Sequence, residues 1–145
     1  MTQRDLFPLI PEEIRARASR AMADPAITPC AFQVLTRLIR FPEAAGRERA
    51  ISIADLQAWA RLNGFHVYSD REIKAAVKQL IEEHDVPIGS VRYEPAGYFV
   101  LCSAEDIEIA ERPILGEIRS LARRLRCTNP KSEISRTLCG QMGIE

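Results

Sequence analysis

Three basic side chains recur at helical spacing in the segment SDREIKAAVKQLIEEHD, residues 69–85. At about 100° per residue, Arg71, Lys74 and Lys78 fall on one face of a helix, together with the small residue Ala75. Arginine and lysine contact phosphate groups and base edges, and a small residue lets a helix approach a groove closely. We therefore predict that this face contacts double-stranded DNA. The alternative is an ordinary solvated helix face whose acidic neighbours act as salt partners.

Capping signals bound the helices that must position this face. Ser69 and Glu72 form a capping box at the start of the proposed recognition helix. Ser52 with Asp55 opens the preceding helix, and Asn63-Gly64 ends it. An earlier helix begins at Thr28-Pro29. The apolar residues at helical spacing that we expect to face the core are Phe32, Leu35, Leu38, Ile39, Leu56, Trp59, Ala60, Ile73, Ala76, Val77, Leu80 and Ile81.

A β-hairpin is predicted directly after the recognition helix. Residues 87–93 and 98–102 are rich in aromatic and β-branched side chains, and residues 95–97 read Pro-Ala-Gly, which is typical of a turn. Ala50-Ile51 is predicted to add a short strand to its edge. A helix–turn–helix followed by a hairpin is the layout of a winged helix, so the predicted fold class is α+β and mostly helical. That fold has one helix and one hairpin tip on the same side, where they can enter adjacent DNA grooves.

Two further residues join the predicted DNA-binding set through this layout. Ser69 lies at the start of the recognition helix, and Arg92 lies near the hairpin tip, where an arginine can enter a narrow minor groove. The alternative for Arg92 is an ordinary surface residue. Arg47 and Arg49 precede another helix start, but Glu48 lies between them, so we expect no phosphate contact there.

Outside the winged helix, an apolar seam is predicted near the C-terminus. Ile114, Ile118, Leu121 and Leu125 are spaced four, three and four residues apart, which predicts a dimerisation helix in an extension over residues 103–126. Packing of this helix against its own winged-helix domain, residues 28–102, is the alternative. Pro113 is expected to kink or restart the helix. Residues 1–27 are predicted to form an N-terminal arm and helix, and residues 127–145 a flexible tail.

Charge and composition exclude several classes of function. Twenty basic and twenty acidic residues give a net charge of zero, unlike a protein that coats nucleic acid. Residues 41–111 hold 7 basic and 13 acidic residues, whereas residues 112–136 hold 7 basic and 2 acidic ones. The four cysteines form no C-x-x-C pair, and no catalytic or phosphate-binding motif is present, so we expect no metal, no cofactor and no enzyme activity. Without a signal peptide or an apolar run of about 18 residues, we expect a cytoplasmic protein with no membrane partner.

Several short motifs resemble small winged-helix proteins encoded by phages and prophages. They are Ser69-Asp70-Arg71-Glu72-Ile73, Val86-Pro87-Ile88 and Gly97-Tyr98-Phe99, followed by an acidic helix start and an arginine-rich helix. The resemblance covers roughly residues 29–126 and departs from the family at the long turn 65–68 and at Pro113. It implies duplex DNA binding by a regulator of transcription or a replication accessory. The alternative function is a winged-helix module for protein–protein interaction that binds no DNA.

Overall fold

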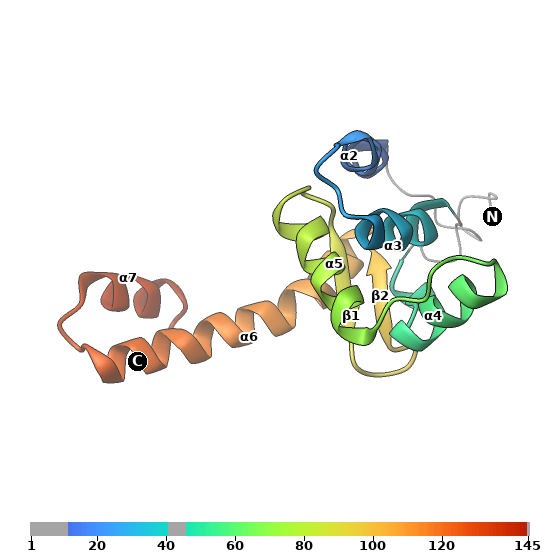
Figure 1. Ribbon diagram of the computed structural model, residues 1–145. Helices are drawn as coiled ribbons and strands as arrows, with labels where there is room; N and C mark the ends of the chain where they lie inside the picture. Colours follow the sequence, from blue (N-terminus) through green and yellow to red (C-terminus); the bar gives the residue numbers. More distant parts are fainter. Residues whose placement is uncertain (1–11, 41–45, 145) are drawn as a thin grey trace. The chain divides into compact units, whose positions relative to one another are not determined.

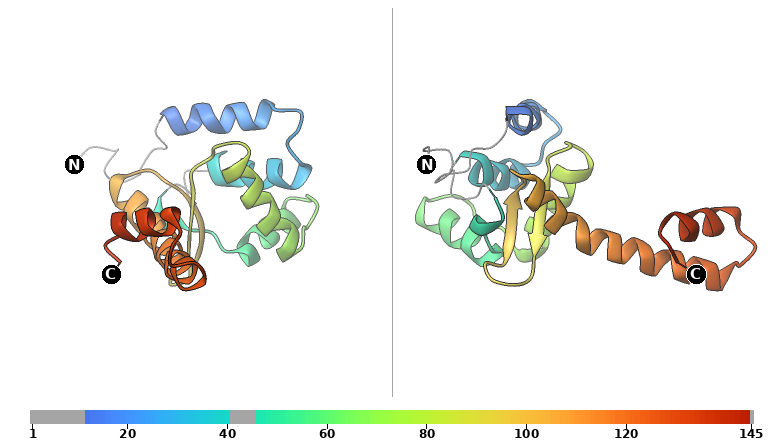
Figure 2. Two further views of the ribbon diagram at one scale, coloured as in Figure 1. Left: turned by 90° about the vertical axis from the view of Figure 1, so that its left-hand side faces the viewer. Right: turned by 180° about the vertical axis from the view of Figure 1, so that it is seen from behind.

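Four of the described helices contribute to the core of the first of two compact units. The computed structural model describes residues 12–40 and 46–144. The first unit ends at Ile107 and the second runs from Glu108 to Glu145. In the first unit α3 (Pro29–Arg40) packs extensively against α5 (Asp70–Glu82), and α4 (Ile53–Leu62) lies between them in the chain. The helix α2 (Glu12–Ala23) covers part of α3, at the end of the unit opposite the hairpin (Figures 1 and 2).

The predicted capping residues begin and end these helices. At the start of α3 the Thr28 hydroxyl accepts a hydrogen bond from the Ala31 backbone N–H at 3.2 Å. At the start of α4 the Ser52 hydroxyl accepts one from the Asp55 backbone N–H at 3.1 Å. Gly64, which follows α4, has a φ of 72°, a conformation that glycine adopts without steric cost. The helix boundaries inferred from local signals are therefore confirmed.

The sheet consists of β1 (Ile88–Val91) and β2 (Gly97–Val100), which pair antiparallel. Both strands are shorter than predicted, so the connecting loop takes in residues 92–96. Ile51 pairs with Tyr98 on the outer edge of β2 through two backbone hydrogen bonds of 2.8 Å. The predicted contribution of Ala50-Ile51 to the sheet edge is thus confirmed as a single bridge. The first unit is a mostly helical α+β structure.

The hydrophobic core lies between α3, α5 and the sheet, and two predicted core residues lie outside it. Its largest fully buried apolar side chains are Leu35, Leu38, Leu80, Val86, Phe99 and Val100. Phe32 and Ile81 are each 42% exposed, and Trp59 is half-buried. The prediction was wrong for Phe32 and Ile81 because each helix buries only the stripe that faces a neighbouring element, and that stripe is narrower than the apolar pattern.

His84, two residues after α5, has a side chain that is only 4% exposed. Its Nδ1 atom lies 3.7 Å from the Asp24 carboxylate, in the segment between α2 and α3. Asp24 lies 60 residues away in sequence, so no local pattern could have indicated this pair. The contact joins the end of α5 to the α2–α3 connection.

The second unit contains most of α6 (Ala104–Thr128) and α7 (Glu133–Gln141). α6 continues through Pro113 as one helix and does not restart there. Residues 133–141, which were predicted to belong to a flexible tail, form α7 instead. The Ser132 hydroxyl caps the start of α7 by accepting a hydrogen bond from the Ser135 backbone N–H. Ser135 and Cys139 are buried. Asn129-Pro130 lies just before α7 and therefore marks its boundary.

The N-terminal residues 1–11, including the apolar run 6–10, lie outside the described residues, so only α2 represents the predicted arm over residues 1–27. Within the described ranges, no helix is both long enough and apolar enough to cross a membrane.

Candidate nucleic-acid interface

The helix α5 is held in place by its cap and its apolar face. The Ser69 hydroxyl accepts a hydrogen bond from the Glu72 backbone N–H, and the Glu72 carboxylate accepts one from the Ser69 backbone N–H at 2.8 Å. Hydrogen bonds to this carboxylate from the Ser69 backbone N–H and the Ser69 side chain lower the pKa of Glu72 below its ordinary value of 4.5. Ile73, Ala76, Val77 and Leu80 are buried. Burial of this stripe fixes which face of α5 points to solvent.

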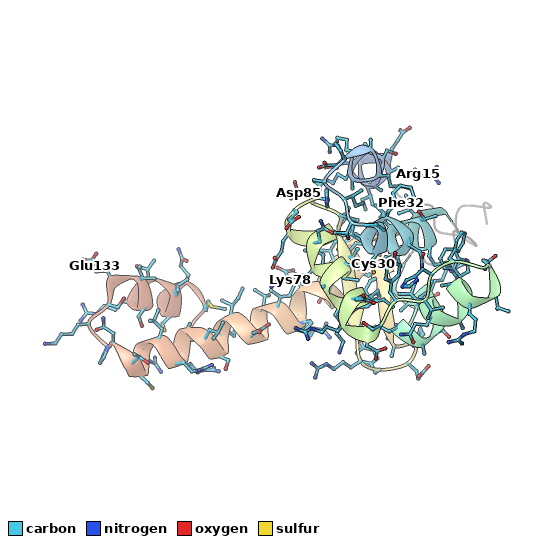
Figure 3. All side chains as sticks on the ribbon, in the orientation of Figure 1. Arg15, Cys30, Phe32, Lys78, Asp85 and Glu133 are labelled. Carbon is cyan, nitrogen blue, oxygen red and sulfur yellow. The ribbon has the colours of Figure 1, made fainter. Side chains whose placement is uncertain are left out.

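The basic face, defined as Arg71, Lys74, Ala75 and Lys78, points to solvent, and all four residues are exposed. None of its three cations forms an ion pair with any residue that the structure describes. Figure 3 shows Lys78 on the side of α5 away from Cys30, whose thiol lies 3.6 Å from the Glu72 carbonyl oxygen at the contact between α3 and α5.

Two of the acidic groups near the basic face are engaged elsewhere. Asp70 accepts a hydrogen bond from the Gln57 side chain at 2.9 Å, and Glu83 accepts one from the Gln79 side chain at 3.2 Å. Glu82, one turn beyond Lys78, is exposed and lies at the C-terminal end of α5. Arg71 and Lys74 lie in the first two turns of α5, beside the carboxylates of Asp70 and Glu72, and Lys78 lies in the third turn.

The hairpin supplies the second part of the interface. Arg92 directly follows β1 and is exposed, as is Tyr93 beside it. Figures 1 and 2 show the hairpin tip and the N-terminus of α5 at the same end of the first unit. Ser69, the N-cap of α5, is also exposed at that end.

Arg47 anchors this hairpin, a role that the sequence did not indicate. It is only 9% exposed, and its guanidinium donates hydrogen bonds to the carbonyl oxygens of Pro95 at 2.6 Å, Tyr93 at 3.0 Å and Glu94 at 3.3 Å. The same group lies 4.6 Å from the centre of the Tyr93 ring. For Arg47 the sequence indicated only the absence of a phosphate contact. In the structure it is a buried cation that shapes the loop bearing Arg92.

Asp106 clamps the other end of the hairpin. Its carboxylate accepts hydrogen bonds from the backbone N–H of Arg47 at 3.2 Å and from that of Cys102 at 3.0 Å. Its own backbone N–H donates a hydrogen bond of 3.1 Å to the Ser103 hydroxyl, just before the start of α6. One buried carboxylate therefore links the segment before α4 to the end of the sheet.

The predicted dimerisation residues lie in the second unit and are exposed. We define the α6 seam as Ile114, Ile118, Leu121 and Leu125, whose exposed fractions are 57%, 40%, 52% and 36%. On α6, the residue that α7 buries is Ala122, whose carbonyl oxygen lies 3.7 Å from the Cys139 thiol. The α6 seam is thus left open by its own unit.

An aromatic hollow of about 500 Å³ opens between α3, α4 and the turn that precedes α5. The aromatic side chains that line it are Phe32, Trp59, Phe65 and Tyr68. Phe32, on α3, is 42% exposed (Figure 3). The hollow could not be predicted from the sequence, in which Phe32 and Trp59 lie at positions typical of core residues.

In the described part of the chain, no three His, Cys, Asp or Glu side chains are grouped as a metal site would require. Comparison of this chain with protein-family models, with curated proteins and with solved structures finds no match.

Proposed function

We propose that the first unit is a winged helix that binds duplex DNA. In this assignment α3, α4 and α5 are the three helices of the fold, Ile51 is the short first strand, and β1 and β2 form the wing. The observation that carries the proposal is the basic face of α5, which is exposed and forms no ion pair with a described residue. Cations left without protein partners are available to phosphate and base edges.

Each residue of the interface has a distinct part in the proposed complex. Arg71 and Lys74, in the first two turns of α5, reach base edges in the major groove, and Ala75 permits close approach of the helix. Lys78 and the Ser69 hydroxyl contact phosphate groups. Arg92 contacts the backbone or the minor groove from the wing, in a loop that Arg47 holds in shape.

The acidic surroundings limit this binding to a local patch. Because residues 41–111 carry 13 acidic and 7 basic side chains, long-range attraction to DNA is weak. Affinity must then come from a few direct contacts, which favours sequence-selective binding of modest strength. A regulator of transcription or a replication accessory of a phage or prophage fits such binding.

The proposal is tested by reversing the charge of the basic face. We expect the double variant Lys74→Glu/Lys78→Glu to lose binding to a labelled pool of random duplexes in a gel shift at low salt. The matched control is Arg15→Glu/Arg20→Glu, which makes the same change of charge on exposed positions of α2, opposite the hairpin tip. The control is expected to bind as the wild type does.

The salt dependence of binding supplies a second measurement. Each phosphate contact that is lost makes the slope of log K against log salt shallower by about one. We therefore expect a shallower slope for Lys78→Ala than for the wild type. Equal binding by the Lys74→Glu/Lys78→Glu variant, or an equal loss in the α2 control, would remove the assignment of this face.

A second candidate function is a winged-helix module that binds a protein partner. It is favoured by the aromatic hollow at Phe32, Trp59, Phe65 and Tyr68, because exposed apolar hollows of this kind accept apolar side chains of a partner. The acidic stretch over residues 41–111 also fits a protein partner better than DNA. Failure of the wild type to bind a duplex-DNA column at low salt would favour this function over the first.

A further inference from the structure

Charge is divided along the exposed part of α6. Residues 108–117 carry three glutamates and one arginine, whereas residues 118–128 carry four arginines and no acidic residue. Arg119 and Arg123 are both exposed and lie four residues apart, so they repel each other on the same face. An isolated α6 therefore lacks the negative charge that would balance its C-terminal half.

Two exposed side chains beside the α6 seam have opposite charges and no partner within the helix. Glu108 pairs with Arg112 at 3.5 Å, so these two opposite charges already have partners within the helix. Glu117 and Arg124 have only uncharged residues three and four positions away in either direction, and neither forms an ion pair with a described residue. Both lie at the position just before a seam residue, on the same edge of the seam.

We propose that two copies of this chain pair antiparallel through the α6 seam. The spacing of the seam sets one register, in which Ile118 packs against Leu121 of the second copy, and Ile114 packs against Leu125 of the second copy. The two-fold axis then passes between residues 119 and 120. Four apolar layers are buried, and each chain contributes the same residues to both sides of the interface.

This register brings the two unpartnered charges together. Glu117 and Arg124 of the second copy differ by about 3 Å in height along the axis, on the same edge of the interface. Both side chains tilt toward the N-terminus of their own helix, and in an antiparallel pair this tilt brings them closer. The symmetry gives two such ion pairs. On the other edge lie Leu115 and Ala122, and Ala122 is already covered by α7.

A parallel pair of the same helices lacks these contacts. In a parallel pair Glu117 would lie opposite Ala122 of the second copy, and Arg124 would lie opposite Asn129, so neither charge would gain a partner. The opposite charges of Glu117 and Arg124 therefore favour the antiparallel arrangement. The inference does not depend on DNA binding by the first unit.

The pairing is tested by solution mass with a charge swap. We expect the wild type to have twice the monomer mass of 16.3 kDa in light scattering. The single substitution Glu117→Arg turns both ion pairs into pairs of like charge, and so does Arg124→Glu. Each variant should weaken the dimer about tenfold or more. The double swap Glu117→Arg/Arg124→Glu restores both ion pairs and should recover the dimer. Arg123→Glu, on the outer face of α6, is the control and should leave the mass unchanged.

Orientation is tested by cross-linking in a Cys127→Ser background, which removes the exposed native thiol. We expect a short bifunctional thiol reagent to join Glu117→Cys chains to tagged Arg124→Cys chains. Arg124→Cys chains alone should not cross-link, because their two cysteines lie about 13 Å apart along the axis.

A monomeric wild type at the highest attainable concentration would overturn the proposal. A dimer that is insensitive to the single charge reversals, or that cross-links through Arg124→Cys alone, would also overturn it. Circular dichroism of each variant distinguishes loss of pairing from loss of folding.

Discussion

The guanidinium of Arg47 is enclosed by the loop of the hairpin and donates to three backbone carbonyl oxygens. Only arginine presents several planar donors from one side chain, so a lysine could satisfy at most part of this set. The carbonyl groups are held at one end of the unit as a result, and the neighbouring Arg92 remains exposed. Arg47 thus shapes the loop that carries Arg92.

Replacing Arg47 by methionine should destabilise the first unit by about 2–3 kcal/mol, because the carbonyl oxygens then lose their donors. Arg47→Lys should recover only part of this loss. Urea unfolding followed by the fluorescence of Trp59, the single tryptophan, measures the effect. The control Arg61→Met, at an exposed position of α4, should change stability by less than about 0.5 kcal/mol. Equal effects of the two substitutions would contradict the anchoring role.

The four thiols differ in reactivity because their surroundings differ. Burial, with a smaller contribution from Glu72, raises the pKa of Cys30 to about 11. Burial and the nearby Asp106 raise the pKa of Cys102 to about 11 as well. Cys127 is exposed. Since the thiolate is the reactive form, only about one in a thousand Cys30 or Cys102 thiols is ionised at pH 8.

We therefore expect iodoacetamide at pH 8 to modify Cys127 first, as measured by mass spectrometry of proteolytic fragments. The rate at Cys102, which is half-buried, should rise as the pH approaches 11, because its thiolate population increases. Faster modification of Cys30 than of Cys127 in the folded protein would contradict this order.

Among the elements, the hairpin depends on a glycine at its contact with Ile51. Gly97 has a φ of 131°, and a side chain there would overlap the carbonyl group of Ile51. This close approach allows Ile51 to pair with Tyr98 and so attaches the hairpin to the segment before α4. The conformation and the contact both exclude a larger residue.

Gly97→Ala should lower the free energy of unfolding by about 2–4 kcal/mol, from backbone strain together with the overlap. The control is Gly64→Ala. Gly64 also has a positive φ, of 72°, but a side chain there would meet nothing within 4 Å. Gly64→Ala should lower the free energy of unfolding by only about 1 kcal/mol. Thermal unfolding of both variants separates the cost of backbone strain from the cost of the overlap with Ile51. Equal losses of stability would show that the contact with Ile51 contributes nothing.

Across the entire chain, the distribution of charge matters more than its total. The net charge is zero, yet an acidic stretch over residues 41–111 carries a local basic face, and α6 is divided into an acidic and a basic half. The two proposals use different surfaces: α5 with the hairpin for DNA, and the α6 seam for a second copy. Their tests are independent, so failure of one leaves the other standing.

The amino-acid sequence by itself determined the features that depend on neighbours a few residues away. Ser52 and Ser69 cap helices, Gly64 ends one, and the basic face follows from the period of a helix. These interactions form within a single turn, so local residue types suffice to predict them. The prediction was wrong near the C-terminus, where residues 133–141 form α7 in place of a flexible tail.

Tertiary structure alone decided the contacts between distant segments. Arg47 reaches the hairpin loop 46 to 48 residues later, Asp106 reaches Arg47 from 59 residues away, and His84 is buried against Asp24. Phe32 is exposed because of where α3 lies against its neighbours. No period or cap in the chain encodes such pairs, since they exist only once packing of the core has brought the segments together.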